Sequence, residues 1–259
     1  MLVAGIDIGS ITTEALLFDT EKGIVGYTIL QTGANSKKTS EIAVEKVLAY
    51  PGKSVSDISY AISTGCGRKR AAFAKEAVTE ITCIAKGVNY IFPEARTIID
   101  IGGQDTKVIR VDDKGRVVEF EMNDKCAAGT GRFIEVMAKA LNVELDKIGE
   151  ISLQHKKELT ISSICTVFAE SEVISLVSEG EELEDILYGI HKAIADRTMG
   201  LINRLGGVTP EVIMAGGVAK NIGVVKALEK VVNNPIKIHV EPQILGALGA
   251  ALIALEKVA

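Results

Sequence analysis

The chain contains two copies of one short pattern, at residues 6–19 and 99–112. Each copy opens with Ile-Asp-Ile-Gly, has a threonine four residues after the glycine, and closes on an aspartate. Apolar runs broken by a glycine and then by a polar turn predict three consecutive strands. Chance supplies Asp-Ile-Gly twice more easily than it supplies the same turn, threonine and closing aspartate. We therefore infer an internal duplication and two related halves.

Segments with helical periodicity follow each copy, so strands alternate with helices along the chain. Helices are expected at residues 37–50, 68–92 (continuous or interrupted), 132–142, 166–179, 183–205, 219–232 and 246–256, and further strands at 58–63, 211–214 and 236–239. This order predicts an α/β fold with domains at residues 1–95 and 96–244. The segment 245–259 is expected to pack back on the first domain. A ligand site is expected in the cleft between the domains.

Composition argues against nucleic acid and membranes as partners. Across 259 residues the net charge is −5, tryptophan is absent and aromatic residues make up 4%, so a basic surface and base-stacking rings are poorly supported. The longest apolar stretch, residues 244–255, is broken by glycines and is too short to span a bilayer. No basic segment precedes Asp7, which favours a strand over a signal peptide. A cytoplasmic protein is expected.

The two glycine turns have the chemistry of phosphate-binding turns. Glycine lets the backbone approach phosphate oxygens, and the exposed N–H groups of the turn donate hydrogen bonds to them. Asp7 and Asp100 each end a strand and are expected to hold Mg²⁺ through water, because Mg²⁺ dehydrates reluctantly. One such turn alone is better explained as a plain hairpin. Two related turns, followed by Gly216 and Gly217 between a strand and a helix, favour phosphate binding, and the P-loop pattern is absent.

Cys126 and Cys165 are distinctive because each is expected just before a helix. None of the four cysteines has the Cys-x-x-Cys spacing of a zinc ribbon. Two thiolates are half of what a four-cysteine iron–sulfur cluster needs, and a symmetric dimer would present two pairs. Helix N-termini would stabilise such an anion by about 0.3–1 kcal/mol each. Cysteines that only pack, and a zinc ion bridging a dimer, are the alternatives.

The remaining cysteines, the histidines and an acidic run are expected to serve packing or solvation. Cys83 lies on an apolar helical face, whereas Cys66, between two glycines, fits either an exposed or a packed position. The three histidines have no ligand spacing. The acidic run at residues 179–185 is expected at a helix start that faces water, with a contribution to partner docking as the alternative.

Five glycine-bearing segments follow an order that resembles the acetate/sugar kinase, Hsp70 and actin superfamily. They are the two turns, residues 129–131, residues 215–218 and residues 246–251. The match covers nearly the whole chain. The resemblance implies two ribonuclease-H-like domains, ATP in the cleft between them, and closure coupled to the state of the nucleotide.

Residues 123–133 and 165–173 resemble the activator component of (R)-2-hydroxyacyl-CoA dehydratases. That family includes ATPase subunits of benzoyl-CoA reductase and reductases of double-cubane cluster proteins. The resemblance implies a homodimer with one [4Fe–4S] cluster on the two-fold axis, held by Cys126 and Cys165 of each subunit. It also implies an ATP-hydrolysing, one-electron reductase of anaerobic metabolism. Ferredoxin or flavodoxin would supply the electrons, and an iron–sulfur protein of the dehydratase or double-cubane type would accept them.

The residues of the turns are assigned to ATP and Mg²⁺. Asp7 and Asp100 are expected to bind Mg²⁺ through water and to position water for catalysis, and either Gln104 or Asp105 to orient the attacking water. The residues expected to contact the nucleotide are Gly9, Ser10, Ile11, Thr12, Thr13, Gly102, Gly103, Gln104, Gly129 and Thr130, with Gly216, Gly217 and Val218 towards the adenosine and Gln243 near the base. Glu14 stands where superfamily members often carry lysine. Its carboxylate would repel phosphate, so it is expected to point away.

Other functions share the same ATP-binding frame. A sugar or acetate kinase is one, although such kinases are usually longer and no sugar pocket is apparent. The ATPase subunit of a benzoyl-CoA reductase-type complex is another. A scaffold like Hsp70 or actin would leave the cysteine segments without a purpose. The electron acceptor itself is not fixed by the sequence.

Overall fold

The computed structural model describes residues 1–49, 51–162 and 165–258. The last residues of the predicted segments 37–50 and 245–259, and the two residues before Cys165, lie outside this part of the chain. The chain divides into two compact units, which we describe separately. The first comprises Met1–Ile98, Val111–Val118 and His239–Ala259, and the second comprises Ile99–Arg110 and Glu119–Ile238. The predicted domain limits at residues 95 and 244 stay a prediction.

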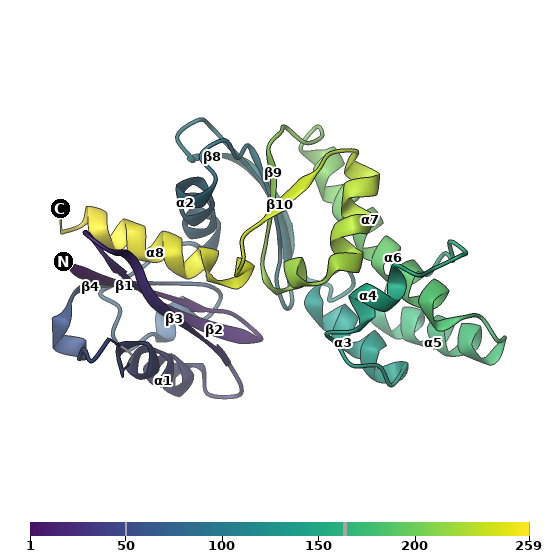
Figure 1. Ribbon diagram of the computed structural model, residues 1–259, viewed down its shortest axis with the longest axis horizontal. Coiled ribbons are helices and arrows are strands. Elements are labelled where there is room, and N and C mark those ends of the chain that lie inside the picture. Colours follow the sequence, from purple (N-terminus) through teal and green to yellow (C-terminus); the bar gives the residue numbers. More distant parts are fainter. Residues whose placement is uncertain (50, 163–164, 259) are drawn as a thin grey trace. The chain divides into compact units, whose positions relative to one another are not determined.

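Strands and helices alternate along the described chain (Figure 1). The strands are β1 (Leu2–Ile8), β2 (Thr12–Asp19), β3 (Gly23–Gln31), β4 (Ile58–Thr64), β5 (Glu76–Ala77), β6 (Thr97–Ile101), β7 (Thr106–Val111), β8 (Val117–Asn123), β9 (Val212–Ala215) and β10 (Ile236–Ile238). The α-helices are α1 (Ser36–Ala49), α2 (Glu80–Ile91), α3 (Gly131–Ala140), α4 (Ile148–Ser152), α5 (Thr166–Ser178), α6 (Leu183–Arg204), α7 (Ile222–Val232) and α8 (Leu245–Glu256). The predicted α/β class and both three-strand repeats are confirmed.

The first sheet has the strand order β3-β2-β1-β4-β5. β1 pairs antiparallel with β2, in a register that places Asp7 opposite Glu14, and parallel with β4. Every residue of β1 is buried, as expected of a strand covered on both faces. α1 packs against β2 and β3, and α8 packs against β1 and β4. Figure 1 shows α1 and α8 on opposite faces of this sheet.

Glycines allow α8 to lie very close to β1 and α2. A Cβ atom at Gly5 would clash with the carbonyl oxygen of Ala247, and one at Gly249 would clash with the carbonyl oxygen of Cys83. α8 is buried along most of its length, and its apolar residues surround the helix, which is the pattern of a core helix. Cys83 is fully buried here, so its predicted packing role is confirmed. The last helix is therefore fixed on the first strand by backbone contact.

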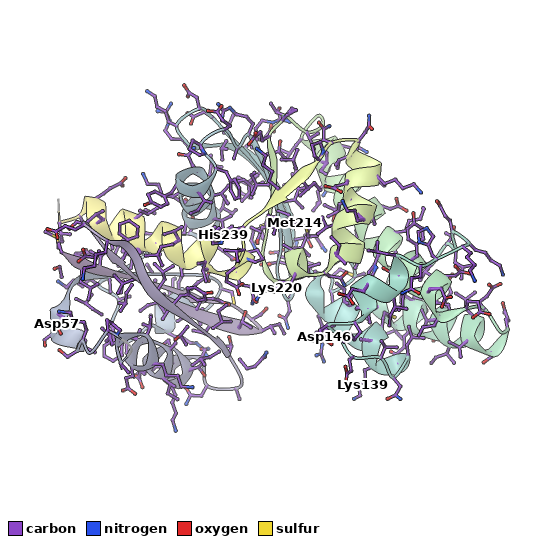
Figure 2. The ribbon with its side chains drawn as sticks, in the orientation of Figure 1. Asp57, Lys139, Asp146, Met214, Lys220 and His239 are labelled. Atoms are coloured by element: carbon purple, nitrogen blue, oxygen red, sulfur yellow. The ribbon has the colours of Figure 1, made fainter. Side chains whose placement is uncertain are left out.

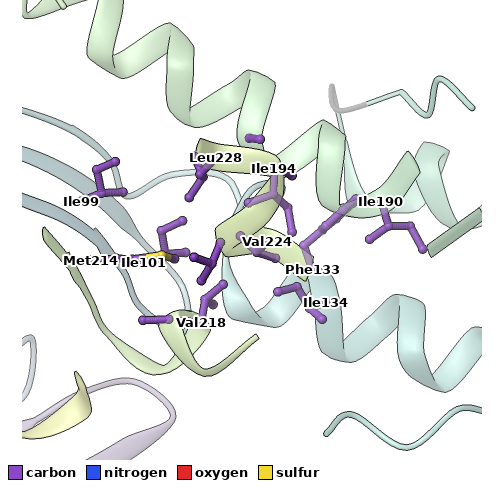
Figure 3. Packing of buried hydrophobic residues seen from close by; sticks show 14 of the residues in the cluster. Ile99, Ile101, Phe133, Ile134, Ile190, Ile194, Met214, Val218, Val224 and Leu228 are labelled. Atoms are coloured by element: carbon purple, nitrogen blue, oxygen red, sulfur yellow. The ribbon is translucent and has the colours of Figure 1, made fainter. Parts of the chain in front are cut away.

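The second sheet has the strand order β10-β9-β6-β7-β8. Its apolar core joins strands β6, β7 and β9 to helices α3 to α7. Figure 3 shows Ile101 and Met214 of the sheet beside Val224 and Leu228 of α7. In Figure 2 Met214 lies inside this unit, whereas Lys139 and other charged side chains lie on its surface.

A buried polar network links three helices of the second unit. His191 of α6 is fully buried, and its ring contacts the Ser152 hydroxyl of α4 and the Asn221 amide that precedes α7. Asn221 also caps α7, because its Oδ1 accepts hydrogen bonds from the N–H groups of Gly223 and Val224. Polar groups thus fix the spacing of helices that are otherwise held by apolar packing.

Several sequence-based predictions need correction. The predicted helix at residues 68–92 is wrong over its first half, where a 3₁₀ turn is followed by β5, and Thr79 caps the helix that begins at Glu80. The short helix α4 was not predicted. The acidic run at 179–185 does not face water throughout, because Asp185 is buried and accepts hydrogen bonds from two backbone N–H groups. Among the described residues, no helix has the length and apolarity needed to cross a membrane.

Candidate nucleotide site and cysteine centre

The two duplicated turns have the same backbone geometry. In the first, the Gly9 N–H donates to the Thr12 carbonyl at 2.9 Å, and in the second the Gly102 N–H donates to the Asp105 carbonyl at 3.0 Å. A Cβ atom at either glycine would come within 2.8 Å of an oxygen of the residue three positions on. The first turn therefore requires glycine because of a backbone contact, whereas in the second the close atom belongs to the Asp105 side chain. The hairpins belong to different units, and the predicted placement of ATP between them stays a prediction.

In the first unit, three predicted site residues lie near the first turn. Asp7 is the last residue but one of β1 and has 8% of its surface exposed, and a Cβ atom at Gly246 would clash with its carboxylate. The Gln243 side chain donates to Thr12 Oγ1 at 3.2 Å. Asp7, Thr12 and Gln243 are thus brought together by the chain around the start of α8.

The other residues of this turn differ in what they expose. Ser10 is exposed at the tip, and Gly9 and Ile11 are half-buried beside it. Thr13 is fully buried, and its hydroxyl pairs with that of Thr32 at 2.8 Å. The Thr13 side chain is therefore engaged inside the sheet.

Glu14 is a buried acid in the middle of this hairpin. Only 4% of its surface is exposed. Burial, together with the Glu241 and Glu80 carboxylates, raises the pKa of Glu14 to about 8, and a hydrogen bond with Thr12 opposes the shift. Glu14 is consequently mostly neutral at pH 7. Its expected orientation away from phosphate stays a prediction.

The second hairpin has a charged triad that the sequence reasoning missed. Lys107 is 1% exposed, and its Nζ lies 3.2 Å from Asp100 Oδ2 and 2.8 Å from Asp105 Oδ1. Burial raises the pKa of Asp100, the Lys107 ammonium opposes this, and the Asp105 carboxylate adds to it. The alignment of the two repeats contained the signal, because Lys107 falls at the position of Glu14.

Predicted glycines from two other segments lie directly against this second turn. The Gly131 N–H donates to the Gly102 carbonyl at 2.9 Å. Gly216 has a positive φ of 82°, and a Cβ atom there would lie 2.8 Å from Asp100 Oδ1. The backbone at Gly216 therefore lies against the Asp100 carboxylate, and the backbone at Gly131 lies against the turn that follows Asp100.

The remaining predicted residues of the second unit are placed as follows. Gln104 is exposed at the tip of the turn. Thr130 is fully buried, and its hydroxyl donates to the Ala127 carbonyl. Val218 is buried within the apolar core, so its side chain does not face the surface of the turn. Gly217 begins the 3₁₀ turn that contains Val218.

The two cysteines occupy different local structures. Cys165 is the N-cap residue of α5, as predicted. Cys126 lies in the connection between β8 and α3, and α3 begins only at Gly131, so the prediction of a helix directly after Cys126 is wrong. The positive φ of 88° at Gly129 prevents an earlier start. Both cysteines are half-buried thiols, and α3 packs against α5.

The surface beside Cys165 is strongly apolar. Val167 and Phe168, in the first turn of α5, expose 65% and 66% of their surfaces, and Ile174 and Val177 expose more than half of theirs. Thr166 Oγ1 is buried and has no hydrogen-bond partner among the described residues. A thiol with an unused hydroxyl donor and a helix N-terminus next to it suits a negatively charged group. The donor set of half-buried thiols therefore fits iron–sulfur ligation.

The model of one protein family matches residues 4–254, which is nearly the whole chain. The chain belongs to the BadF/BadG/BcrA/BcrD ATPase family. It is therefore an ATPase, and the predicted resemblance is confirmed.

Two relatives of this ATPase match over nearly their full lengths. It is 48% identical to the activator of lactoyl-CoA dehydratase of Anaerotignum propionicum, over 99% of this chain and 98% of that protein. It is 34% identical to a benzoyl-CoA reductase subunit of Thauera aromatica, over 97% of this chain and 92% of that protein. A solved structure of the activator of the 2-hydroxyisocaproyl-CoA dehydratase from Clostridium difficile, with bound ADPNP, superposes with a TM-score of 0.94 at 45% identity and covers 99% of this chain and 95% of that one.

Proposed function

We propose that this ATPase is a reductive activator that uses ATP to drive single electrons into an iron–sulfur partner enzyme of the 2-hydroxyacyl-CoA dehydratase or double-cubane type. The observation that carries the proposal is Cys165 at the N-cap of α5, beside the exposed Val167 and Phe168. A plain kinase or scaffold of this fold has no use for that combination. The similarity to dehydratase activators over the whole chain supports the same function.

ATP and ADP would bind at the glycine turns. In the second unit, Gly102, Gly103 and the backbone at Gly129 and Gly216 would face the phosphates; Gly216 lies against Asp100, and the segment after Gly129 is hydrogen-bonded to the turn through Gly131. In the first unit, the exposed tip at Ser10 and the pair of Thr12 with Gln243 would contribute. The assigned units would correspond to ribonuclease-H-like domains at residues 1–95 and 96–244.

Mg²⁺ would bind at Asp7 and Asp100 through water. Asp100 is 4% exposed and already paired with Lys107, which suits an indirect contact better than direct ligation. Gln104, exposed at the tip, or Asp105 would orient the attacking water. Hydrolysis of this kind needs positioned charge and an aligned water rather than a covalent intermediate.

One [4Fe–4S] cluster per homodimer would be held by Cys126 and Cys165 of each subunit. A cluster bound there supplies one-electron redox chemistry at low potential. The exposed apolar residues of α5 would be covered when two copies meet, which is the expected state for such a helix face. Ferredoxin or flavodoxin would supply electrons, and the proposed location is the cytoplasm, where thiols remain reduced.

The first experiment tests the cysteine centre. Protein purified without oxygen should be brown and contain iron. Replacing Cys126 or Cys165 by serine should abolish the iron, whereas Cys66→Ser, which removes the exposed thiol of the first unit, should leave it unchanged. Colourless protein that contains zinc would establish the zinc-bridged dimer instead.

The second experiment tests coupling. Reduced protein is mixed with a 2-hydroxyacyl-CoA dehydratase or a double-cubane protein, and electron transfer is followed with ATP, with ADP and without nucleotide. Transfer should require ATP hydrolysis. Equal transfer without nucleotide would contradict the proposed function, and phosphorylation of a small acceptor would establish a kinase.

A second candidate is the ATPase subunit of a benzoyl-CoA reductase-type complex. The 34% identity to the benzoyl-CoA reductase polypeptide of Thauera aromatica over nearly the whole chain favours it. Stable co-purification with other reductase polypeptides, in place of a homodimer that docks transiently, would support this candidate.

A further inference from the structure

The two hairpins share their backbone but differ in the residue opposite the strand-end aspartate. In the first hairpin the register places Glu14 opposite Asp7. In the second, Lys107 stands the same number of residues beyond the matched turn and pairs with Asp100. The duplication has therefore kept an acid opposite an acid in one copy and a cation opposite an acid in the other.

Lys107 is held inside the second unit by two carboxylates. Its side chain is 2% exposed, that of Asp100 is 6% exposed and that of Asp105 is 24% exposed. A buried ammonium is costly unless its donors are paired, and its three N–H groups can serve two carboxylates at once. Since Asp105 is also the residue that closes the turn, Lys107 joins the strand-end acid to the tip of the hairpin.

We propose that Lys107 is a positioning residue that holds the Asp100 and Asp105 carboxylates in place for recognition of the Mg²⁺ carried by a bound nucleotide. The inference rests on the proposed function, because it takes the second hairpin as a nucleotide site. Lys107 itself would touch neither metal nor phosphate. It acts from behind the carboxylates, as outer groups commonly orient the residues that receive a metal.

The charge of the triad has a consequence for how the metal arrives. Two carboxylates and one ammonium leave a net charge of −1, where the carboxylates alone would carry −2. A divalent cation is therefore attracted weakly by the triad alone and more strongly when nucleotide phosphates add their charge. The triad should favour the metal–nucleotide complex over the free metal.

The test compares ADP binding with Mg²⁺ and with EDTA, measured by calorimetry on oxygen-free dimeric protein. The quantity of interest is the dissociation constant of ADP in EDTA divided by that with Mg²⁺. A purely structural defect weakens ADP binding equally under both conditions and leaves this ratio unchanged. Lys107→Met should reduce the Mg²⁺-dependent gain by roughly 10- to 100-fold, because the two carboxylates lose the group that orients them. Loss of the ammonium charge alone would act in the opposite direction, by repelling ADP in EDTA and attracting Mg²⁺, so a larger gain would overturn the positioning role. Lys107→Gln, which keeps hydrogen-bond donors but loses the charge, provides a second variant if the first does not fold, and it should also lower the ratio.

Lys226→Met is the matched control, because Lys226 pairs with Glu229 on the surface of the same unit. It should leave the ratio unchanged. A folded Lys107 variant with the wild-type ratio would overturn the positioning role while leaving the proposed function intact. Wild-type protein that binds no ADP would overturn both. Equal losses with and without Mg²⁺ would reduce Lys107 to a structural ion pair and would also overturn the proposal.

Discussion

His191 Nδ1 lies 2.8 Å from Ser152 Oγ in the interior of the second unit, and its Nε2 lies 3.2 Å from the Asn221 side-chain nitrogen. The Asn221 amide Oδ1 caps α7, so its NH₂ group faces the ring and must donate to it. His191 Nε2 is therefore an acceptor and Nδ1 carries the proton. The Ser152 hydroxyl accepts a hydrogen bond from His191 Nδ1 and donates one to the Gly149 carbonyl. This network has room for only a neutral imidazole.

The network predicts acid sensitivity. Burial lowers the pKa of His191 to about 3, from 6.5. The neutral His191 ring contributes its full share of the free energy of unfolding above pH 6.5. That share is lost as the pH falls towards 3, because in this range only the unfolded chain binds a proton at His191. Between pH 7 and pH 5 this should cost about 2 kcal/mol of unfolding free energy. His191→Gln should be less stable at pH 7 but should lose less between the two pH values, as measured by urea unfolding. Parallel losses in both proteins would contradict this assignment.

Glu14 predicts the opposite pH dependence. Its folded pKa of about 8 exceeds its ordinary value of 4.5, so the folded state retains a proton that the unfolded chain releases. Stability should therefore fall as pH rises from 4.5 to 8, by up to about 1.4 kcal/mol per pH unit. Glu14→Gln should remove this slope and be the more stable protein at pH 8. Unfolding midpoints at pH 5, 6.5 and 8 for the two proteins would check it, and an unchanged slope would show that Glu14 is ionised.

Two glycine-to-alanine changes should have opposite signs. A Cβ atom at Gly249 would clash with the Cys83 carbonyl oxygen, so Gly249→Ala should force α8 away from α2 and destabilise by about 1–3 kcal/mol or more. Gly200 lies in α6, and outside that helix no described atom comes within 4 Å of the place that a Cβ atom would occupy. Gly200→Ala should therefore stabilise the helix by about 0.5–1 kcal/mol. Thermal unfolding of both variants would decide, and matching signs would contradict the packing described for α8.

The apolar face of α5 predicts an effect on association. Phe168→Ser should raise the dissociation constant of the proposed homodimer roughly tenfold, about 1.4 kcal/mol. Val240→Ser is the control, because Val240 is 92% exposed outside this surface and its loss should not matter. Sedimentation equilibrium of both variants would measure the change. A Phe168 variant that dimerises like the wild type would place the interface elsewhere.

The duplicated hairpins could be predicted because their signals are local. In each hairpin, a glycine, apolar runs on either side of it and a polar turn lie within about 14 residues of sequence. The same holds for Cys165, whose helix begins at the next residue. The Cys126 segment differs. The start of α3 is set by Gly129 and Thr130, which lie after the cysteine and turn the chain before the helix can form.

Other features depended on contacts that no local pattern encodes. Residues 76–77 became β5 because β4 offered an open edge, which overrode the helical periodicity of that stretch. The five residues of α4 are too few for a periodic signal and are held by Ser152 and its buried partners. In the sequence Lys107 has the features of an ordinary strand lysine, and only the folded sheet buries it. Only the comparison of the two repeats, position by position, could have pointed to it.

The contact of α8 with β1 bears on how the protein comes into being. β1 (Leu2–Ile8) is synthesised more than 230 residues before the helix that covers it, which is formed by residues 245–256. Most of the second unit, residues 119–238, is synthesised in one stretch and can complete its own core earlier. During translation, the face of the first sheet that α8 later covers therefore stays exposed until residues 245–256 have been synthesised. A chain that stops before residue 245 leaves that apolar face accessible to chaperones and proteases.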